Sequence, residues 1–386
     1  MKKRLAIIGA SYLQKPLVLK AKQMGFETHV FAWEEGAVCR DLANQFYPIS
    51  ITDKKAILDV CKELNISGVV SIASDLASVT VNHLADRLGL IGNSIECTSV
   101  TTNKYLMRRR LRVAGIACPE FVKCTQAEAS ETLNLLNYPV IVKPVDRSGS
   151  RGVSLVEKAS KLSQAIDYAC RESLSGEAII EEYISGREIS VEAISWQGRH
   201  YILQYTDKDT TGAPHYVEKA HHQPAYLTQC ETNSVSEMVL NALDALGIDY
   251  GASHTEIRFD SNGNPFIIEV GARMGGDFIG SDLVELSTGY DFVRGVIEVA
   301  TGSFSEPVIS KRGHSGIHYV YPKPGILSAV IFKGSDHVVS HNVLVPMGST
   351  ISTICESSQR PAYYTYKSDK RMEFDPNELI LLTEDR

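Results

Sequence analysis

Short apolar runs alternate with amphipathic stretches along the first hundred residues of the chain. Apolar runs predict strands at 4–8, 27–32 and 68–72, and helical spacing predicts helices ending near residue 24 and at 54–64 and 79–88. Strands alternating with helices in this way are typical of βαβ units and a parallel sheet. The turn Gly9-Ala10-Ser11 lacks the full GxGxxG pattern, so a tight strand-to-helix turn is favoured over a dinucleotide site.

The pattern changes after residue 100. A helix rich in lysine and arginine is predicted at 103–114, and a solvated basic face is its simplest interpretation. Further strands are predicted at 138–143, 154–156, 178–183, 188–196 and 201–206, with helices at 159–170, 232–246 and 283–300. A polar stretch at 207–224 fits neither period. Strands at 318–321, 326–332 and 338–345 indicate a smaller β-rich terminal region.

The stretch from Gly251 to Asp277 predicts two strands joined by a two-residue turn at Asn262-Gly263. Counting outward from a Ser261–Asn264 pair places Glu256 opposite Glu269. The same count puts one apolar face on the core, made of Ile257, Phe259, Phe266, Ile268 and Val270. The other face carries His254, Glu256, Arg258 and Glu269.

Two facing carboxylates on adjacent strands lie about 5 Å apart at Cβ and repel each other. Such a pair is tolerated where the face is well solvated or where a cation lies between the two groups. Mg²⁺ takes carboxylate oxygens and keeps positions open for phosphate. The hairpin alone therefore leaves a polar outer face and a metal site as alternatives.

Composition narrows the class of protein. The 386 residues are 44% hydrophobic and 22% charged, as in a soluble globular protein of two or three domains. A net charge of -7 gives no bulk attraction to nucleic acid or to an anionic membrane surface. No apolar run reaches the ~20 residues that cross a bilayer. The eight cysteines are scattered without a CxxC pair, so we expect reduced thiols and a cytoplasmic protein.

One loop is suited to anion binding, and a later segment allows more than one interpretation. The loop at 146–153 (DRSGSRGV) combines glycines, hydroxyls and arginines, and consecutive backbone N–H groups can form an anion nest. Lys143 leaves an apolar strand just before it, which favours a phosphate ligand over a mobile hairpin loop. The run 179–188 (IIEEYISGRE) could equally be a strand leaving the core for solvent.

Taken in order, these segments resemble the ATP-grasp superfamily over residues 1–305. The resemblance rests on Lys104, Lys143-Pro144, the SGSRGV loop, EEYISGRE, and the Glu256/Glu269 pair followed by GARMGG. The runs EKAHHQPA and IEVGARMGGD are most similar to the amino-acid (dipeptide) ligases of its carboxylate–amine branch.

The resemblance implies an α/β fold with four parts. These are a Rossmann-like parallel-sheet domain at 1–100, a helical linker and small lid subdomain at 101–183, a larger antiparallel-sheet catalytic domain with the metal-binding hairpin at 184–305, and a C-terminal β-rich region at 306–386. The last region matches poorly and could complete a substrate pocket or support a homodimer.

The resemblance also implies where ATP binds. Lys104 and Lys143 correspond to lysines that contact the phosphates. The flap over the phosphates corresponds to Ser148, Gly149, Ser150, Arg151, Gly152 and Val153. The segment whose backbone reads the adenine edge corresponds to Glu181, Glu182, Tyr183 and Ile184, and Glu188 corresponds to the acidic residue that holds the ribose hydroxyls.

Metal and substrate positions follow in the same way. Glu256 and Glu269 correspond to Mg²⁺ ligands, with Mn²⁺ as a compatible substitute, and Arg273 to the arginine that grips the substrate carboxylate and its acyl phosphate. Glu218 and His221 correspond to polar residues of the amino-acid pocket. Many relatives carry an asparagine two residues after the second metal ligand. Here that position is Gly271, which has no side chain to contribute.

The implied activity is ATP-dependent ligation of a carboxylate to an amine through an acyl phosphate, with small-molecule substrates and release of ADP and phosphate. Two alternatives stay open from the sequence. One is an ATP-grasp enzyme that uses bicarbonate, either a carboxylase or a carbamoyl-phosphate type. The other is a nucleotide-binding protein without catalysis.

Overall fold

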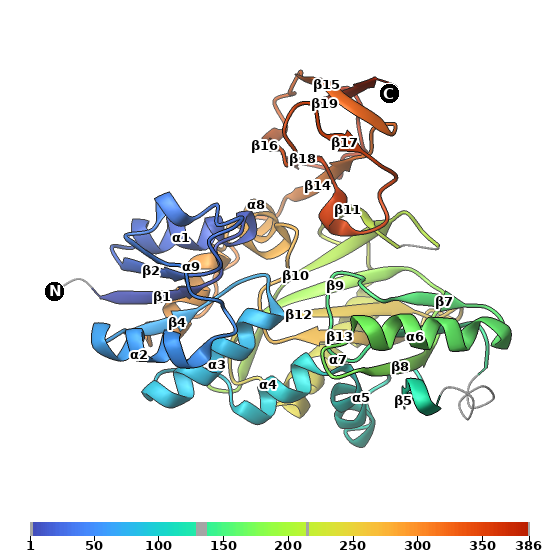
Figure 1. Cartoon of the computed structure of the whole chain (residues 1–386), viewed down its shortest axis with the longest axis horizontal. Helices are drawn as coiled ribbons and strands as arrows, with labels where there is room; N and C mark the ends of the chain where they lie inside the picture. The colour runs from blue at the N-terminus through green and yellow to red at the C-terminus, as the bar shows by residue number, and fades with distance from the viewer. Residues whose placement is uncertain (1–2, 129–136, 214–215, 385–386) are drawn as a thin grey trace.

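The computed structural model describes residues 3–128, 137–213 and 216–384. Its N-terminal part is a parallel sheet with strand order β3-β2-β1-β4 (Figure 1). The strands are β1 (Arg4–Ile8), β2 (Glu27–Phe31), β3 (Gln45–Tyr47) and β4 (Gly68–Val70). The helices around them are α1 (Lys15–Gln23), α2 (Lys54–Leu64) and α3 (Asp75–Leu88). The parallel sheet predicted from the alternation is confirmed.

Capping residues define where these helices begin. Asp53 accepts a hydrogen bond from Ala56 N–H at the start of α2, and Ser74 accepts one from Ala77 N–H at the start of α3. The structure also contains a helix that the sequence pattern missed, α4 (Ile95–Thr102), which Ser94 caps. The basic helix follows as α5 (Lys104–Val113).

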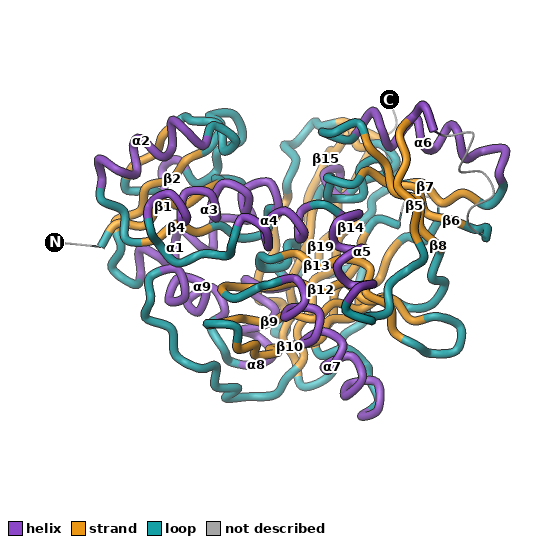
Figure 2. Tube along the Cα trace, turned by 90° about the horizontal axis from the view of Figure 1, so that it is seen from below, coloured by secondary structure: helices purple, strands orange, loops and turns teal. Residues whose placement is uncertain are grey.

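A small antiparallel sheet, here called the lid sheet, lies at the opposite end of the molecule from α1 to α3 (Figure 2). Its order is β5-β8-β6-β7, with β5 (Phe121–Thr125), β6 (Val140–Pro144), β7 (Ser154–Val156) and β8 (Glu177–Glu182). Helix α6 (Leu162–Glu172) covers one face, and Val142, Ile166 and Ala169 are fully buried between them. The lid sheet is thus a folded unit with its own apolar core.

The largest sheet has eight strands in the order β13-β12-β9-β10-β11-β14-β18-β16. Its first part is β9 (Glu188–Trp196), β10 (Arg199–Thr210), β11 (Glu218–Gln223), β12 (Tyr250–Phe259) and β13 (Pro265–Gly271). Helix α7 (Gln229–Leu246) packs on it through Val235, Val239 and Leu243. The polar stretch at 207–224 therefore contains the end of β10 and all of β11.

The C-terminal region supplies the other three strands of this sheet. They are β14 (His314–Val320), β16 (Val338–Val343) and β18 (Ala362–Ser368). The remaining strands, β15 (Gly325–Phe332), β17 (Thr350–Ile351) and β19 (Leu379–Glu384), form a separate three-stranded sheet that rises above the large one (Figure 1). The C-terminal region is therefore continuous with the central sheet.

The hairpin of β12 and β13 has the predicted pairing at Glu256–Glu269, but the pairing differs between these residues and the turn. Glu256 pairs with Glu269, but a β-bulge follows and Ile257 pairs with Ile267. The predicted two-residue turn is wrong: Asp260 N–H bonds to Asn264 O, so the loop holds three residues, with Gly263 at φ 82°. The predicted core face is wrong in part for the same reason. Ile267 is fully buried, whereas Phe266 and Ile268 are only half-buried.

Three further features complete the fold. The chain after β13 forms a short π-helix (Ile279–Leu283), α8 (Val284–Thr288) and α9 (Phe292–Ala300), and α9 buries Val293 and Ile297 in the core of the N-terminal sheet. All eight cysteines are free, and five are buried. In the described part of the chain, no helix combines the length and apolarity that a membrane span requires.

Candidate active site

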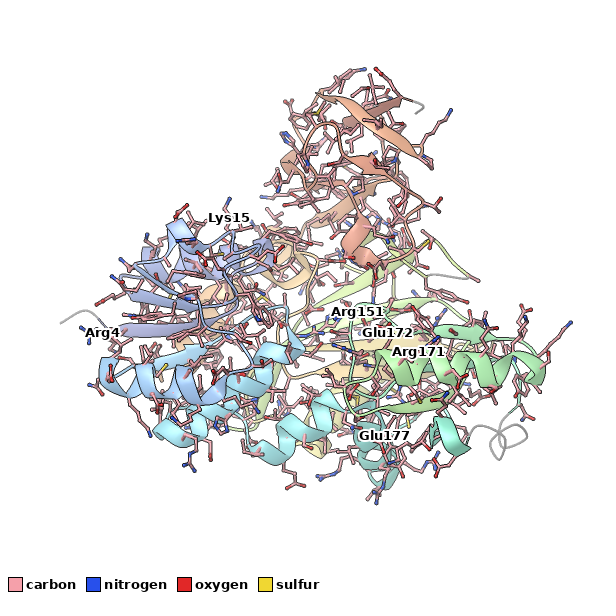
Figure 3. All side chains as sticks on the ribbon, in the orientation of Figure 1. Arg4, Lys15, Arg151, Arg171, Glu172 and Glu177 are labelled. Carbon is pink, nitrogen blue, oxygen red and sulfur yellow. The ribbon has the colours of Figure 1, made fainter. Side chains whose placement is uncertain are left out.

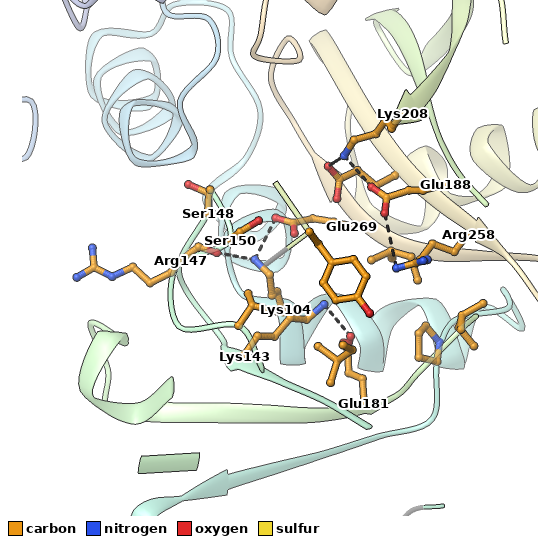
Figure 4. Close-up of a pocket in the computed structure, with 18 of the residues that line it drawn as sticks. Lys104, Lys143, Arg147, Ser148, Ser150, Glu181, Glu188, Lys208, Arg258 and Glu269 are labelled. Atoms are coloured by element: carbon orange, nitrogen blue, oxygen red, sulfur yellow. Dashed lines mark hydrogen bonds and ion pairs between the residues drawn. The ribbon is translucent and has the colours of Figure 1, made fainter. Parts of the chain in front are cut away.

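A cavity of about 190 Å³ lies between the lid sheet and the β9–β13 end of the large sheet (Figure 4). We call it the first cavity. It brings together most of the residues predicted to bind ATP or metal: Lys104, Lys143, Ser148, Gly149, Ser150, Arg151, Val153, Glu181, Glu182, Tyr183, Ile184, Glu188, Glu256 and Glu269. Arg273 and Glu218 also line it. These side chains come from α5, both sheets and the loops between them.

The two hairpin carboxylates each have a lysine partner. Lys208 Nζ lies 2.7 Å from Glu256 Oε1, and Lys104 Nζ lies 3.0 Å from Glu269 Oε1. Lys104 also donates to the carbonyl of Arg147 at 2.7 Å. The repulsion expected between Glu256 and Glu269 is thus offset by two ammonium groups. Burial opposes ionisation of Glu256, but Lys208 and His254 hold its pKa well below the usual range.

Lys208 is the main residue that the sequence analysis missed. Its side chain is 5% exposed, and its ammonium lies 2.7 Å from both Glu188 and Glu256 and 4.0 Å from Glu218. Burial favours the neutral amine, yet these carboxylates raise the pKa of Lys208 well above its normal value, so it stays charged. Its signal was faint, because Lys208 stands in the polar stretch where no strand was predicted.

A second buried network holds Lys143. Its ammonium lies 2.7 Å from Glu181 Oε2, and Arg108 Nε lies 2.9 Å from Glu181 Oε1. Arg108 has no exposed surface, and it donates to the carbonyl of Ile268, next to Glu269. Burial lowers the pKa of Lys143, and Glu181 opposes that shift. The prediction of a solvated basic face on α5 is therefore wrong at Arg108. This residue is buried and joins the lid sheet to the hairpin.

The glycine loop between β6 and β7 forms one wall of the first cavity. Gly149 and Ser150 have φ of 71° and 59°, so consecutive left-handed residues turn the loop sharply. Arg151 lies at the end of the lid sheet that faces the middle of the molecule (Figure 3). Gly152 is not in the wall. A Cβ there would lie 2.7 Å from Pro144 Cγ, so this glycine permits close packing of the loop.

Arg273 is held by a residue from the N-terminal domain. Its Nε and Nη2 atoms lie 2.7 and 3.0 Å from the two carboxylate oxygens of Asp75, the first residue of α3. The same ion pair explains why the residue two positions after Glu269 is a glycine. A Cβ at Gly271 would approach Arg273 Cζ to 3.2 Å and Asp75 Oδ1 to 3.3 Å, so glycine keeps room for this ion pair.

A second cavity of about 690 Å³ adjoins the first and shares Lys208, Glu218, Glu256 and Arg273 with it. Its other walls come from the N-terminal domain, the chain after β13 and the C-terminal region. Glu218 and His221, which were predicted to be polar residues of an amino-acid pocket, both line this cavity. The C-terminal region contributes Arg360, which the sequence analysis did not single out and which no local pattern marks.

The hairpin carboxylates suit a hard divalent cation. Each already pairs with an ammonium group, and each presents oxygen atoms at the wall of the first cavity. Among the described residues, no cluster of three or more acidic, histidine or cysteine side chains is arranged around a metal position. A cation here would take its remaining ligands from phosphate oxygens and water, as Mg²⁺ commonly does.

Comparison with known proteins agrees with this geometry. A family model described as an ATP-grasp domain matches residues 136–282. The matched segment contains Lys143, Glu256 and Glu269, and over this segment the chain is similar to the ATP-grasp domain. Its fold resembles that of the L-amino acid ligase from Bacillus licheniformis, with a TM-score of 0.84 at 23% identity over 100% of this chain and 99% of that one. The ATP-grasp fold predicted from the sequence is confirmed.

Curated relatives match part of the chain. It is 30% identical to an uncharacterized protein of Sinorhizobium fredii over 250 residues, which are 62% of this chain and 50% of that protein. It is 26% identical to dapdiamide A synthase of Enterobacter agglomerans over 305 residues, 72% of this chain and 70% of that enzyme. The chain thus spans half the length of the first of these relatives.

Proposed function

We propose that this chain is an ATP-dependent carboxylate–amine ligase that joins an amino acid to a second substrate through an acyl phosphate. One observation carries the proposal. The facing carboxylates Glu256 and Glu269 lie in one cavity with the cationic groups of Lys104, Lys143, Lys208 and Arg273, and that cavity adjoins a second one large enough for small molecules. The cations suit phosphates, and the adjoining space suits the molecules to be joined.

A carboxylate does not condense with an amine in neutral water, because oxide is too poor a leaving group. Transfer of the γ-phosphoryl group of ATP to a carboxylate oxygen gives an acyl phosphate, and ADP leaves. The amine then attacks the carbonyl carbon, and phosphate departs as the amide forms. Positioning and neutralisation of charge are the main tasks of a protein in such a transfer.

The residues of the first cavity are assigned to those tasks. Lys104, Lys143 and Lys208 place ammonium groups around the phosphates, and the 146–153 loop adds backbone N–H donors and excludes water. Glu256 and Glu269 would hold the divalent cation, Mg²⁺ or Mn²⁺, which supplies positive charge to the phosphate oxygens when bound. Arg273, oriented by Asp75, holds the carboxylate that is activated.

The attacking amine must lose a proton, and Glu218 suits that role better than His221. Glu218 Oε2 accepts a hydrogen bond from Ser357 at 2.7 Å, while the charge nearest to Oε1 is Lys208 at 4.0 Å. Its side chain is 20% exposed, whereas that of His221 is 1% exposed and bonded to Asp277. An accessible carboxylate oxygen in the second cavity can accept a proton directly.

The proposal is tested by phosphate release from MgATP with the full chain and pairs of amino acids, followed by mass spectrometry of the product. Release that needs amino acids, with a product lighter by one water than the two substrates together, supports the ligase. Release that needs bicarbonate supports a carboxylase or carbamoyl-phosphate enzyme instead. No release with either would indicate a nucleotide-binding protein without catalysis.

A cytoplasmic location suits an ATP-using enzyme with free thiols. A homodimer stays a prediction that light scattering can check.

A further inference from the structure

The second cavity carries more carboxylates than the ligase reaction needs. Besides the metal ligand Glu256, its wall includes Asp75, Glu218 and Asp277. One carboxylate can receive the α-ammonium group of an amino acid, and Asp75 is occupied by Arg273. Asp277 has no part in the transfer or the attack described above.

The carboxylates are also the exposed ends of their ion pairs. The side chain of Asp277 is 17% exposed, against 2% for its partner Arg360. Glu218 is 20% exposed, against 5% for Lys208. In both pairs the cation is more deeply buried than the carboxylate. A molecule that enters the second cavity therefore meets the carboxylates of Asp277 and Glu218 first.

Asp277 is held in place by three contacts. Arg360 Nη1 and Nη2 donate to its two oxygens, each at 2.7 Å, and His221 Nε2 lies 3.3 Å from Oδ2. A carboxylate has about four acceptor positions, so Asp277 keeps room for one further donor. The Arg360 guanidinium stacks on the ring of Tyr319 at 3.6 Å, which anchors the pair to β14.

The backbone at this point is strained. Asp277 and Phe278 have φ of 52° and 61°, and neither is glycine. Two successive residues in the left-handed region cost free energy that the surrounding contacts must supply, and such strain gathers at ligand-binding positions. Arg360, from the C-terminal region, supplies the contact that keeps the Asp277 carboxylate at the cavity wall.

We propose that Asp277 is a specificity-determining residue that makes the second cavity select an amino acid with a second cationic group, such as lysine, ornithine, arginine or a diamino acid. The inference rests on the proposed ligase function and names the class of one of its substrates. The extra ammonium or guanidinium group binds Asp277, and Glu218 remains for the reacting end of the molecule.

The rest of the cavity suits such a side chain. Apolar groups of Leu13, Val38, Ile279 and Leu344 also line the second cavity. A basic amino acid has an aliphatic stem that covers apolar surface and a charged tip that seeks a polar partner. These apolar groups and the Asp277 carboxylate together match both parts.

The first test compares substrates that differ only in the terminal charge. Phosphate release by the full chain with MgATP is measured for each amino acid, paired in turn with every other amino acid as the second substrate. Lysine is then compared with norleucine, and arginine with citrulline. We expect kcat/KM for the charged member to exceed that for the neutral member by about tenfold or more, because a neutral side chain would cover the open acceptor position of Asp277 without donating to it. Equal values, or a preference for the neutral member, would overturn the inference while leaving the ligase intact. Absence of release with every amino acid would instead refute the ligase function.

The second test changes Asp277 itself. Asn tolerates a left-handed backbone, so Asp277→Asn keeps the local conformation and removes the charge. The charged-to-neutral ratio of kcat/KM should fall about tenfold towards one, with the change mainly in KM for the charged substrate. Glu306→Gln removes an exposed carboxylate that pairs with Arg199, and it should leave the ratio unchanged.

Loss of Asp277 also leaves Arg360 buried without its carboxylate, which can destabilise the fold. The double variant Asp277→Asn/Arg360→Met removes both charges together and avoids that penalty. It should show the same loss of the charged-to-neutral ratio at a thermal midpoint nearer to that of the unmodified protein. A folded double variant that keeps the full preference for lysine over norleucine would overturn the role of Asp277.

Discussion

Asp75 and Arg273 form a two-point ion pair that joins the N-terminal domain to the candidate active site. The Arg273 Nε–Asp75 Oδ1 and Nη2–Oδ2 distances are 2.7 and 3.0 Å, and the two residues are 198 positions apart in the sequence. Burial opposes both charges, but Arg273 still lowers the pKa of Asp75, so the carboxylate stays ionised. The N-terminal domain therefore orients the arginine assigned to the substrate carboxylate.

Replacement of Asp75 by Asn should lower kcat by roughly ten- to a hundredfold, because a misplaced positioning group costs that much without contacting the reaction. The measurement is steady-state phosphate release with the substrates identified as above, together with a thermal melt. Asp86→Asn, at an exposed position on the same helix, is the matched control. Unchanged kinetics in Asp75→Asn would show that Arg273 is oriented without it.

The elements that carry the hairpin carboxylates could be predicted because the signal is local. Alternation along β12 and β13 places Glu256 opposite Glu269, and the bulge lies beyond that pair. The bulge itself leaves no clear mark in the sequence, so the predicted strand pairing between Glu256 and the turn was wrong. Composition likewise pointed to the glycine loop, and the family resemblance pointed to the segment at 181–184; both line the same cavity.

Some residues reach the site through tertiary contacts that no local sequence pattern marks. Strand β11 reads EKAHHQ, and its last four residues are buried although most are polar. Their hydrogen bonds run to distant residues, such as His222 to Tyr366 at 2.8 Å. Lys208, Arg108 and Arg360 share this property, because each pairs with a carboxylate far away in the sequence.

Gly271→Ala should lower activity, although the change adds only a methyl group. The new Cβ would lie 3.2 Å from Arg273 Cζ and 3.3 Å from Asp75 Oδ1, so the ion pair would have to shift. We expect kcat to fall roughly tenfold, since small displacements of positioning groups are costly. Gly313→Ala is the control, because its Cβ would meet only Ser368 O at 3.7 Å. Full activity in Gly271→Ala would show that the Asp75–Arg273 ion pair accommodates the added methyl group without losing its function.

Glu269→Gln should reduce phosphate release by about a hundredfold or more, because the neutral amide removes one of two anionic ligands expected for the divalent cation. Its contact with Lys104 at 3.0 Å can persist through the amide oxygen, so the fold should remain. Titration calorimetry with MgATP separates lost binding from lost chemistry. Glu237→Gln on the exposed face of α7 serves as the control. ATP-dependent ligation at the unmodified rate in Glu269→Gln would remove Glu269 from the metal site.

His318 gives the fold a dependence on pH that is separate from the active site. It is 2% exposed, its Nε2 donates to the carbonyl of Met372 at 3.2 Å, and it packs against His222 and Tyr366. Burial lowers the pKa of His318 to about 3, and His222 adds to the shift. The unfolded chain binds this proton below about pH 6.5, whereas the folded chain does not until about pH 3. Stability from this group is therefore complete above pH 6.5 and falls as the pH drops below it.

His318→Gln should remove this part of the pH dependence while keeping a side-chain donor for Met372. Between pH 7 and pH 5, the unmodified protein should lose about 2 kcal/mol more unfolding free energy than the variant, because one unfolded-state proton is taken up over about 1.5 pH units. Urea unfolding at both pH values measures the difference. His337→Gln, at an exposed position, should keep the pH dependence of the unmodified protein. Equal losses in His318→Gln and the unmodified protein would show that His318 accepts its proton in the folded state.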